Sequence, residues 1–492
     1  MSMFSYLFGN KTPANETKQD MGGSSKGDMC PNAARLPLAE GMSLSQWLQN
    51  VRGNPLLDHR TTEQLPQEAD VVIIGSGVSG ATTALALMQS QTPPKSIVML
   101  EARELCSGAT GRNAGHCKPD QWRGFVKYQQ RFGTEQALKI LANEQETWEK
   151  IVAYVKEHNV DCDLWVGKTL DVPVTDEVAE ATAIIYEACK AAGGPVDKVE
   201  VITDKAEAVK RSRIKSACAV YAWDASTLYP WKLVAHVVKR CIDMGVNLQT
   251  WTPALSVTES ADKPGQWVVV TDRGSITTPS VVHCTNAYAA ALLPEFNNVI
   301  LPTPHMCNRA IPTRKWSGGG ALQNSYGVLL PGGAMFSINP RCTADGVVLF
   351  GGSNPGQDAL HKYLDENPDR RTHDSLSNFE PVTKPVRDFT QTEFEGWGTQ
   401  FAAGEGYDYS WSGIIGASAD GVPYVGAVPG KKGQWICAGH NGHGMARVFT
   451  CGPALAKLMQ GATWAEAGLP EVFELTEERL ARLQKVDFKW RI

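Results

Sequence analysis

The chain has 492 residues, which is too long for one compact core, so two or three domains are expected. Its apolar fraction of 42% is that of an ordinary globular protein, and its net charge is −5. No basic stripe and no apolar run long enough to span a bilayer stand out, which argues against a nucleic-acid partner and against a membrane protein.

The twelve cysteines are scattered along the chain. They form no CxxC pair and no Cys/His spacing typical of zinc, so we expect no metal site. They are predicted to be mostly reduced thiols, which suggests a cytoplasmic protein.

The first elements are predicted in chain order from local patterns. Residues 1–41 contain the tract "GGSSKGD" and predict a disordered extension. Residues 42–69, with a short helix near their start, form an arm that leads into the first strand. A buried parallel strand at 70–74, a helix at 80–90 and a second strand at 96–100 follow.

The later pattern changes character twice. Residues 121–165 and 175–192 are predicted to be helical, and short β segments with turns begin at residue 199. Near the C-terminus, "QWICAGHNGHGMARVFTCGPALAKLM" predicts a strand, a glycine-rich turn and a helix.

Gly75, Gly77 and Gly80 form G-x-G-x-x-G between the first strand and helix. The glycines permit a tight turn, close approach to a pyrophosphate, and close packing of helix and strand. Glu101 ends the second strand, where its carboxylate can bond ribose hydroxyls and disfavours NADP. The pattern predicts dinucleotide binding; a glycine-rich turn in a non-binding domain is the alternative.

Five further segments occur in one order. They are "GATGRNAG" (108–115), "TLYPWKLVAHVVKRCIDMGVNLQT" (227–250), "VVHCTNAYAAALLP" (281–294), "WSGIIGASADGVPYVGAVP" (411–429) and "AGHNGHGM" (438–445). Together with the first loop they resemble the D-amino-acid oxidase (DAO) family of FAD-dependent oxidoreductases. The arm "PLLDHRTTEQLPQEADVVIIGSG" most resembles fungal members.

The resemblance implies FAD, bound in an extended form. Attachment is expected to be non-covalent, because Arg112 stands where some members carry a linking histidine, and Ile415 and Gly416 stand where others carry a linking cysteine. The cofactor-binding residues it implies are Gly75, Ser76, Gly77, Val78, Ser79, Gly80, Glu101, Ala102, Arg103, Thr110, Gly111, Arg112, Asn113, Ala114, Gly115, Ala254, Thr285, Gly442, His443, Gly444 and Met445.

The family's fold is expected to be α/β (α+β), a Rossmann-like FAD-binding domain with an inserted antiparallel-sheet substrate domain. The FAD-binding domain is predicted at 70–120, 220–300 and 405–475, the substrate domain at 121–219 and 301–404, and a C-terminal tail at 476–492. At the last loop, a helix N-terminus with the amides of Gly442, Gly444 and Met445 could stabilise the charge of a reduced flavin. A plain strand–helix turn is the alternative.

The expected activity is hydride removal from a C–N bond of an amine or amino acid, with O2 as acceptor. Alternatives are a dehydrogenase with another acceptor, an oxidase acting on an alcohol or polyol carbon, and a flavin-binding protein without turnover. The partner is a small-molecule substrate, and the oligomeric state is left open.

Candidate substrate residues follow from the same resemblance. Arg341 is predicted to bind a substrate carboxylate through its guanidinium fork, with a salt bridge as the alternative. His116 and His443 are candidate catalytic residues, with packing or hydrogen bonding as the alternative, and His305 is expected over the flavin. Tyr407, Tyr409 and Trp411 (407–411) form either an aromatic wall over the substrate or a packed cluster. The charged segment 362–375 is expected to be exposed.

Overall fold

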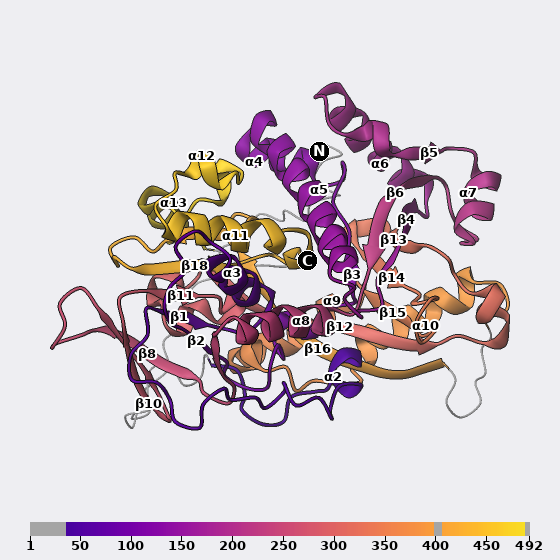
Figure 1. Ribbon diagram of the computed structural model, residues 1–492. Coiled ribbons are helices and arrows are strands. Elements are labelled where there is room, and N and C mark those ends of the chain that lie inside the picture. The colour runs from indigo at the N-terminus through magenta and orange to yellow at the C-terminus, as the bar shows by residue number, and fades with distance from the viewer. Residues whose placement is uncertain (1–35, 398–405, 488–492) are drawn as a thin grey trace, which may run out of the picture.

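The computed structural model describes residues 36–397 and 406–487 of the chain. Most of the predicted disordered extension therefore lies outside the described residues. Figure 1 shows two β-sheet regions side by side, with the long helix α5 (Thr134–Glu157) between and above them.

A six-stranded sheet carries the N-terminal motif. Its order is β17-β18-β11-β1-β2-β7, and every pair is parallel except β17 with β18. The strands are β1 (Val71–Ile74), β2 (Ile97–Leu100), β7 (Asn247–Gln249), β11 (Val281–His283), β17 (Tyr424–Ala427) and β18 (Gln434–Ala438).

Both faces of this sheet are covered, which explains the continuous apolar run of β1. Val71 and Ile73 belong to the core that contains the helices α3 (Val78–Met88), α8 (Pro230–Asp243) and α11 (Val448–Met459). Val72 and Ile74 point into a second core on the other face. A three-stranded antiparallel sheet covers that face: β8 (Ala254–Glu259), β9 (Trp267–Thr271) and β10 (Gly274–Thr278).

The second region is a nine-stranded sheet. Its order is β16-β12-β15-β14-β13-β4-β6-β3, with β5 also paired to β6. Its pairs are antiparallel except β4 with β13, so the expected Rossmann-like domain with a second sheet domain is confirmed. The strands are β3 (His116–Cys117), β4 (Trp165–Pro173), β5 (Glu200–Ile202), β6 (Val220–Thr227), β12 (Ile300–Ile311), β13 (Ser325–Leu329), β14 (Met335–Asn339), β15 (Val348–Gly351) and β16 (Gly406–Ser418).

The predicted domain boundaries differ from this topology. β3, β6 and β16 were expected in the FAD-binding domain, but they lie in the nine-stranded sheet, where β6 pairs with β4 and β16 with β12. Strand alternation indicates that a segment is β, and it does not indicate which of two sheets the segment joins.

The remaining helices correct two other expectations. The predicted helical stretch 121–165 consists of α4 (Phe125–Phe132) and α5, and β4 begins at its end. In the predicted C-terminal tail, α13 (Glu477–Leu483) buries Leu480 and Leu483 in a hydrophobic cluster. The other helices are α2 (Gln46–Gln49), α6 (Asp176–Ala191), α7 (Lys205–Ser212), α9 (Gln357–Asp365), α10 (Glu380–Glu393) and α12 (Trp464–Ala467).

Across the described residues, no helix is long and apolar enough to cross a membrane. Within 36–397 and 406–487, no group of His, Cys, Asp and Glu is arranged to hold a metal ion. The eleven cysteines in these ranges are all free.

Candidate active site

One large cavity of about 1430 Å³ brings the predicted loops together. It begins at the carboxyl ends of β1 and β2 and extends to residues of β12, β14 and β16. Ligands of open α/β sheets bind at these carboxyl ends. Leu36 and Pro37 also line it, so the end of the predicted disordered extension is part of the site.

The first loop has the geometry that its glycines predict. Gly75 has φ 110°, and a Cβ there would lie 2.6 Å from the carbonyl oxygen of Cys284. A Cβ on Gly80 would lie 2.0 Å from the carbonyl oxygen of Gly75. Gly77 precedes α3 and offers no side-chain cap, and the Val78 amide donates to Thr110 Oγ1, so the amides that follow Val78 in the first turn are the ones available to an anion such as a phosphate.

Glu101 stands at the end of β2, as predicted. Its Oε2 accepts hydrogen bonds from the Ser76 amide at 3.1 Å and the Ser76 hydroxyl at 2.5 Å, and its Oε1 accepts from the Arg103 amide at 3.2 Å. Glu101 lines the cavity, and these bonds hold its carboxylate where a ribose hydroxyl can reach it.

The second loop is tied to the first. The amide of Val78 donates to Thr110 Oγ1 at 3.1 Å, which joins the start of α3 to the loop. Asn113 braces the loop from within, because its side-chain amide donates to the Thr110 carbonyl at 2.9 Å and its Oδ1 accepts from the Gly115 amide at 2.7 Å. A Cβ on Gly111 would lie 2.3 Å from the Cys106 carbonyl oxygen, so this glycine permits the close turn.

A buried ion cluster connects the second loop and the segment that precedes it to Asp374, which follows α9. Arg103 donates to both carboxylate oxygens of Asp374 at 2.9 Å, and Arg112 Nε lies 3.0 Å from Asp374 Oδ2. The three side chains are at most 2% exposed. Asp374 lies in the charged segment that was expected to be exposed, and this expectation is wrong for Asp374, because two arginines from the FAD loops bury it.

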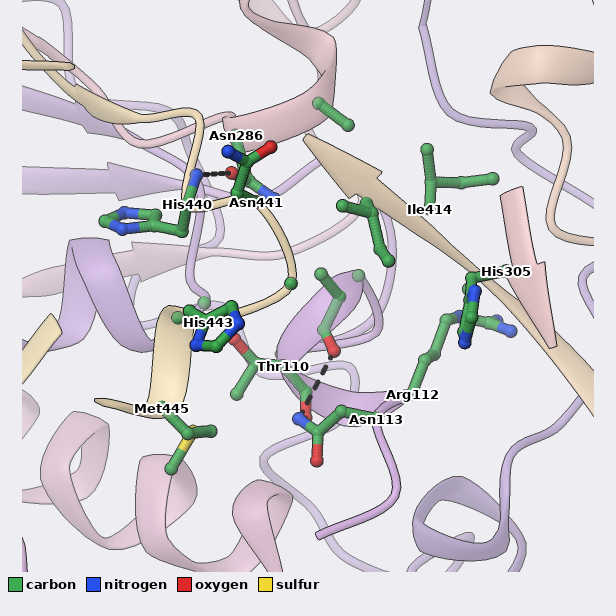
Figure 2. Close-up of a pocket in the computed structure, with 18 of the residues that line it drawn as sticks. Thr110, Arg112, Asn113, Asn286, His305, Ile414, His440, Asn441, His443 and Met445 are labelled. Carbon is green, nitrogen blue, oxygen red and sulfur yellow. Dashed lines mark hydrogen bonds between the residues drawn. The ribbon is translucent and has the colours of Figure 1, made fainter. Parts of the chain in front are cut away.

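The third loop is the glycine-rich turn before α11. Figure 2 shows Asn286 beside His440: Asn286 Oδ1 accepts from the amides of Gly439 at 3.0 Å and His440 at 3.2 Å. Asn441 Oδ1 accepts from the Ser418 amide at 3.0 Å, which ties the turn to β16. Asn286 and Asn441 adopt positive φ, so each stabilises the turn in a conformation that asparagine tolerates better than most residues. Neither was predicted from the sequence as a support of this loop.

The histidines differ in environment. Both ring nitrogens of His116 are buried without a hydrogen-bond partner in the described residues, and burial together with Lys118 lowers its pKa to about 3. Burial and His361 lower the pKa of His305 to about 4. Both rings are therefore neutral near pH 7 and line the cavity. His443 is 40% exposed, and its Nδ1 lies 3.7 Å from Glu144 Oε1.

Glu144 anchors this side of the cavity. Burial raises its pKa, but the charges of Arg447 and His443 outweigh burial and bring the pKa to about 2. Arg447 donates to Glu144 Oε1 at 3.0 Å, and the Asp120 amide donates to Oε2 at 2.9 Å. His443 therefore faces a carboxylate that stays ionised.

Arg341 is the clearest departure from the sequence-based prediction. Its Nε lies 2.8 Å from Asp345 Oδ1 and its Nη2 lies 3.1 Å from Asp163 Oδ2, while its side chain is 4% exposed. It packs over the rings of Trp47 and Tyr229 and is not among the residues that line the large cavity. The guanidinium of Arg341, which was predicted to bind a substrate carboxylate, is thus paired with two carboxylates of the protein. This is the salt bridge that the sequence analysis gave as the alternative.

The predicted aromatic wall is also absent from the lining of the cavity. Trp411 is fully buried and donates to the Arg112 carbonyl at 2.8 Å, and Tyr409 stacks beside it with ring centroids 6.2 Å apart. Tyr407 lies near Arg387, away from the cavity lining. Tyr409 and Trp411 therefore pack together in one hydrophobic core, and Tyr407 packs against another.

The predicted cofactor residues divide into two groups. Those that line the cavity are Gly75, Gly77, Val78, Ser79, Glu101, Ala102, Arg103, Thr110, Arg112, Asn113, Ala114, Ala254, Thr285, Gly442, His443, Gly444 and Met445, with the candidate catalytic His116. Ser76, Gly80, Gly111 and Gly115 lie behind the lining and shape the loops. Figure 2 shows Thr110 and Asn113 on one side of the cavity with His443 and Met445 beside them.

The polar atoms of the cavity fit FAD. Arg112 Nη2 and Thr285 Oγ1 are buried without a hydrogen-bond partner in the described part of the chain, and both residues line the cavity. Buried polar groups are normally hydrogen-bonded, so a ligand with acceptors is expected there. The free helix N-terminus, the fixed Glu101 and these atoms are suited to pyrophosphate, ribose and flavin groups.

Sequence reasoning missed one wall of the cavity. Lys118, Asp120, Arg123, Lys127 and Arg131 all line it. They follow the second FAD loop directly, and this closeness in sequence was the available signal, but the predicted FAD-binding segment ended at residue 120 and residues 121–165 were predicted only to be helical.

Known proteins support this picture. The sequence profile of the DAO family, described as FAD dependent oxidoreductase, matches residues 70–459. The chain is 22% identical over 401 residues to the probable oxidoreductase OrdL of Haemophilus influenzae, covering 80% of this chain and 84% of that protein.

Two solved structures show the same fold. Glycine oxidase from Geobacillus kaustophilus has a TM-score of 0.64 and 19% identity over 84% of this chain and 99% of its own. L-proline dehydrogenase from P. horikoshii has a TM-score of 0.61 and 18% identity over 83% and 98%. The extent of the family match is decisive: the chain belongs to the DAO family of FAD-dependent oxidoreductases, with FAD as its cofactor.

Proposed function

We propose that the protein removes a hydride from a C–N bond of an amine or amino acid and uses O2 as the electron acceptor. The observation that carries this proposal is the continuity of the cavity, which runs from the FAD loops to a wall of cationic and neutral imidazole side chains. The two solved structures described above are named for amino acids as substrates. Bound FAD supplies the two-electron oxidation.

The residues of the chain bind and orient the substrate in this proposal. His116 and His305 have low pKa values because they are buried, so they are poor bases near pH 7. They can instead accept or donate single hydrogen bonds as neutral rings. We propose that the amine enters unprotonated and that His116 orients it. His443, with Glu144 behind it, is the second residue proposed to contact the substrate or flavin.

The choice of acceptor and of reacting carbon needs separate tests. One of the compared proteins is named an oxidase and the other a dehydrogenase, so the fold is compatible with either. An oxidase acting on an alcohol or polyol carbon is the second candidate.

The decisive experiment is an anaerobic titration of the purified holoprotein. Amino acids, amines and polyols are added separately, and loss of flavin absorbance reports reduction. We expect an amino acid or amine to reduce the flavin, and air to reoxidise it rapidly in stopped flow. Reduction by polyols alone would favour the second candidate, slow reoxidation would reject the oxidase, and no reduction by any compound would leave a flavin-binding protein without turnover.

Three finer assignments accompany the proposal. We propose non-covalent FAD, because Arg112, Ile415 and Gly416 occupy the places at which linked family members carry a nucleophile. Acid precipitation tests this, since a yellow pellet would contradict it. The sequence of the arm at 55–77 supports a fungal-type member, and the free cysteines support a cytoplasmic location.

A further inference from the structure

The arm before the first strand contacts the second FAD loop at neighbouring residues. Ser45 Oγ donates a hydrogen bond to the Gly111 carbonyl at 2.5 Å, and Trp47 Nε1 donates to the Asn113 carbonyl at 2.6 Å. Both side chains of the arm are fully buried. The family profile begins at residue 70, so the family pattern does not account for these contacts.

Further hydrogen bonds anchor the same part of the arm. Arg112 Nη1 donates to the Ser43 carbonyl at 2.8 Å, and the Ser43 amide donates to the Asp374 carbonyl at 2.9 Å. The Leu48 amide donates to Ser45 Oγ at 3.1 Å, which begins the short helix α2. These bonds hold the arm against the loop from both ends of the contact.

The contacts behind the loop set the direction of its peptide groups. The Asn113 carbonyl accepts from Trp47, and the Arg112 carbonyl accepts from Trp411 Nε1 at 2.8 Å. Neither tryptophan lines the cavity, so both carbonyls point away from it. In a trans peptide the N–H points opposite to the carbonyl, and the described residues contain no cis peptide bond.

Two loop amides are consequently turned toward the cavity. They are the N–H groups of Asn113 and Ala114, and both residues line the cavity. In the part of the chain that the structure describes, neither amide has a hydrogen-bond acceptor. Two adjacent free amides can bind an acceptor such as a flavin carbonyl or a phosphate oxygen. The bond from Trp47 therefore acts on the FAD site through the peptide group that it orients.

The loop is shaped to receive the indole of Trp47. Gly115 has φ 80°, and a Cβ there would lie 2.8 Å from Trp47 Cζ2, so a larger residue would displace the ring. Trp47 also packs against Tyr229, with ring centroids 4.7 Å apart, and the Tyr229 hydroxyl donates to the Trp47 carbonyl. The indole is thus fixed by the loop and by the residue that precedes α8.

Arg341 supports the same residue. Its guanidinium carbon lies 4.9 Å from the centre of the Trp47 ring, which is within the range of a cation–π interaction. Asp345 pairs with Arg341 at 2.8 Å through Oδ1, and its Oδ2 accepts from Gln46 Nε2 at 2.9 Å. The arginine of the family motif therefore holds the arm against the loop.

We propose that the arm is part of the FAD-binding machinery. Trp47 is a positioning residue that keeps the second loop in the shape that binds FAD, and Arg341 holds Trp47 in place. The proposal is independent of the substrate and of the electron acceptor. It gives the arginine of the family motif a role in cofactor retention instead of substrate binding.

The test measures how fast the diluted holoprotein releases FAD, followed by the rise in flavin fluorescence, and the visible circular dichroism of the flavin that is still bound. Trp47→Phe keeps an aromatic ring and removes the indole N–H. We expect its rate constant for FAD release to rise by about tenfold, the effect of one buried carbonyl left unpaired, and the circular dichroism of the bound flavin to change. Ser45→Ala removes the neighbouring bond and should raise the rate constant several-fold, so it tests the same role if Trp47→Phe does not fold.

Trp267→Phe is the matched control. Trp267 is also a buried tryptophan whose Nε1 donates to a backbone carbonyl, that of Lys432 at 2.9 Å, but this partner lies outside the FAD loops. Its rate constant for FAD release and its flavin circular dichroism are expected to equal those of wild type. Arg341→Gln should raise the rate constant several-fold in an otherwise wild-type chain and much less in Trp47→Phe, because the bond that Arg341 orients is already absent there.

Two results would overturn the role of the arm. One is FAD release and flavin circular dichroism as in wild type in Trp47→Phe, or in Ser45→Ala if Trp47→Phe does not fold. The other is an increase of FAD release in Trp267→Phe as large as that in Trp47→Phe. The role of Arg341 would be overturned if Arg341→Gln raised the rate constant by the same factor in the wild-type and Trp47→Phe chains.

Discussion

Replacing Asp374 by Asn tests whether the buried ion cluster stabilises the protein. Arg103 would lose one of its two hydrogen bonds to the side chain and the opposing negative charge, and its remaining contacts to the carbonyls of Leu38 and Ser107 are long, at 3.4 Å. Arg112 would lose less, since its Nε and Nη1 also donate to three carbonyl oxygens at 2.7–2.9 Å.

The expected cost follows mainly from Arg103. Removing one partner of a buried ion pair costs about 3–5 kcal/mol, and Asn keeps one acceptor, so we expect the free energy of unfolding to fall by about 3 kcal/mol. Urea unfolding of the holoprotein measures it. The pKa of Asp374 supports the direction, because Arg112 and Arg103 together hold it below its ordinary value despite burial.

A double-mutant cycle separates the ion pair from general damage. Once Asp374 is Asn, replacing Arg103 by Met should cost much less than it does in wild type, because the buried charge has already lost its partner. The control is Asp365→Asn, which removes an Asp from an exposed pair with Arg371 in the same segment and should cost at most about 1 kcal/mol. An Asp374→Asn cost no larger than that of the control, or strictly additive costs in the cycle, would refute the reasoning.

Two further variants test the first loop and the acid stability. Gly80→Ala should sharply reduce the amount of FAD retained after gel filtration, because its Cβ would lie 2.0 Å from the Gly75 carbonyl oxygen. The control Gly53→Ala places its Cβ in open space and should retain FAD. Equal retention in the two variants would contradict the proposed role of Gly80 in the loop. Burial lowers the pKa of His283 to about 4 in the folded protein, whereas the pKa of histidine is about 6.5 in the unfolded chain. The neutral ring therefore stabilises the fold fully above about pH 6.5, and this stabilisation is lost as the pH falls toward about 4. From pH 7 to pH 5 the free energy of unfolding, measured with urea, should therefore fall by about 2 kcal/mol more in wild type than in His283→Asn. An equal fall in both proteins would show that the pKa of His283 is not lowered in the folded state.

The FAD loops could be predicted from the sequence because their requirements are local. A glycine is needed at Gly80 because helix α3 packs against a backbone carbonyl five residues earlier, and Glu101 is placed by the end of its own strand. Such constraints act over a few residues and therefore leave a spacing that can be read. The strand, loop and helix at the C-terminal motif were predicted for the same reason.

The long-range partners could not be predicted in this way. Asp374 pairs with an arginine 271 positions away, and its own neighbourhood in sequence is charged and resembles a solvated surface. Strand β6 lies in the range predicted for the FAD-binding domain but pairs with β4 in the nine-stranded sheet, because that partner is chosen by tertiary packing and the alternation of β6 would suit either sheet. Burial of a charge depends on which distant group compensates it, and the sequence pattern carries no direct record of that choice.

The two arginines Arg341 and Arg123 show how this limit affects a functional assignment. The motif around Arg341 is retained, yet Asp163 and Asp345 occupy its guanidinium group. Arg123 has no motif, yet it lines the cavity, and the carboxylates of Asp171, Asp120 and Glu144 all act on its charge. Charge balance therefore limits what a motif can indicate, because an arginine whose charge the protein already neutralises has little affinity left for an anionic ligand. Whether a motif arginine is available to a ligand thus follows from its neighbours rather than from its position in a family pattern.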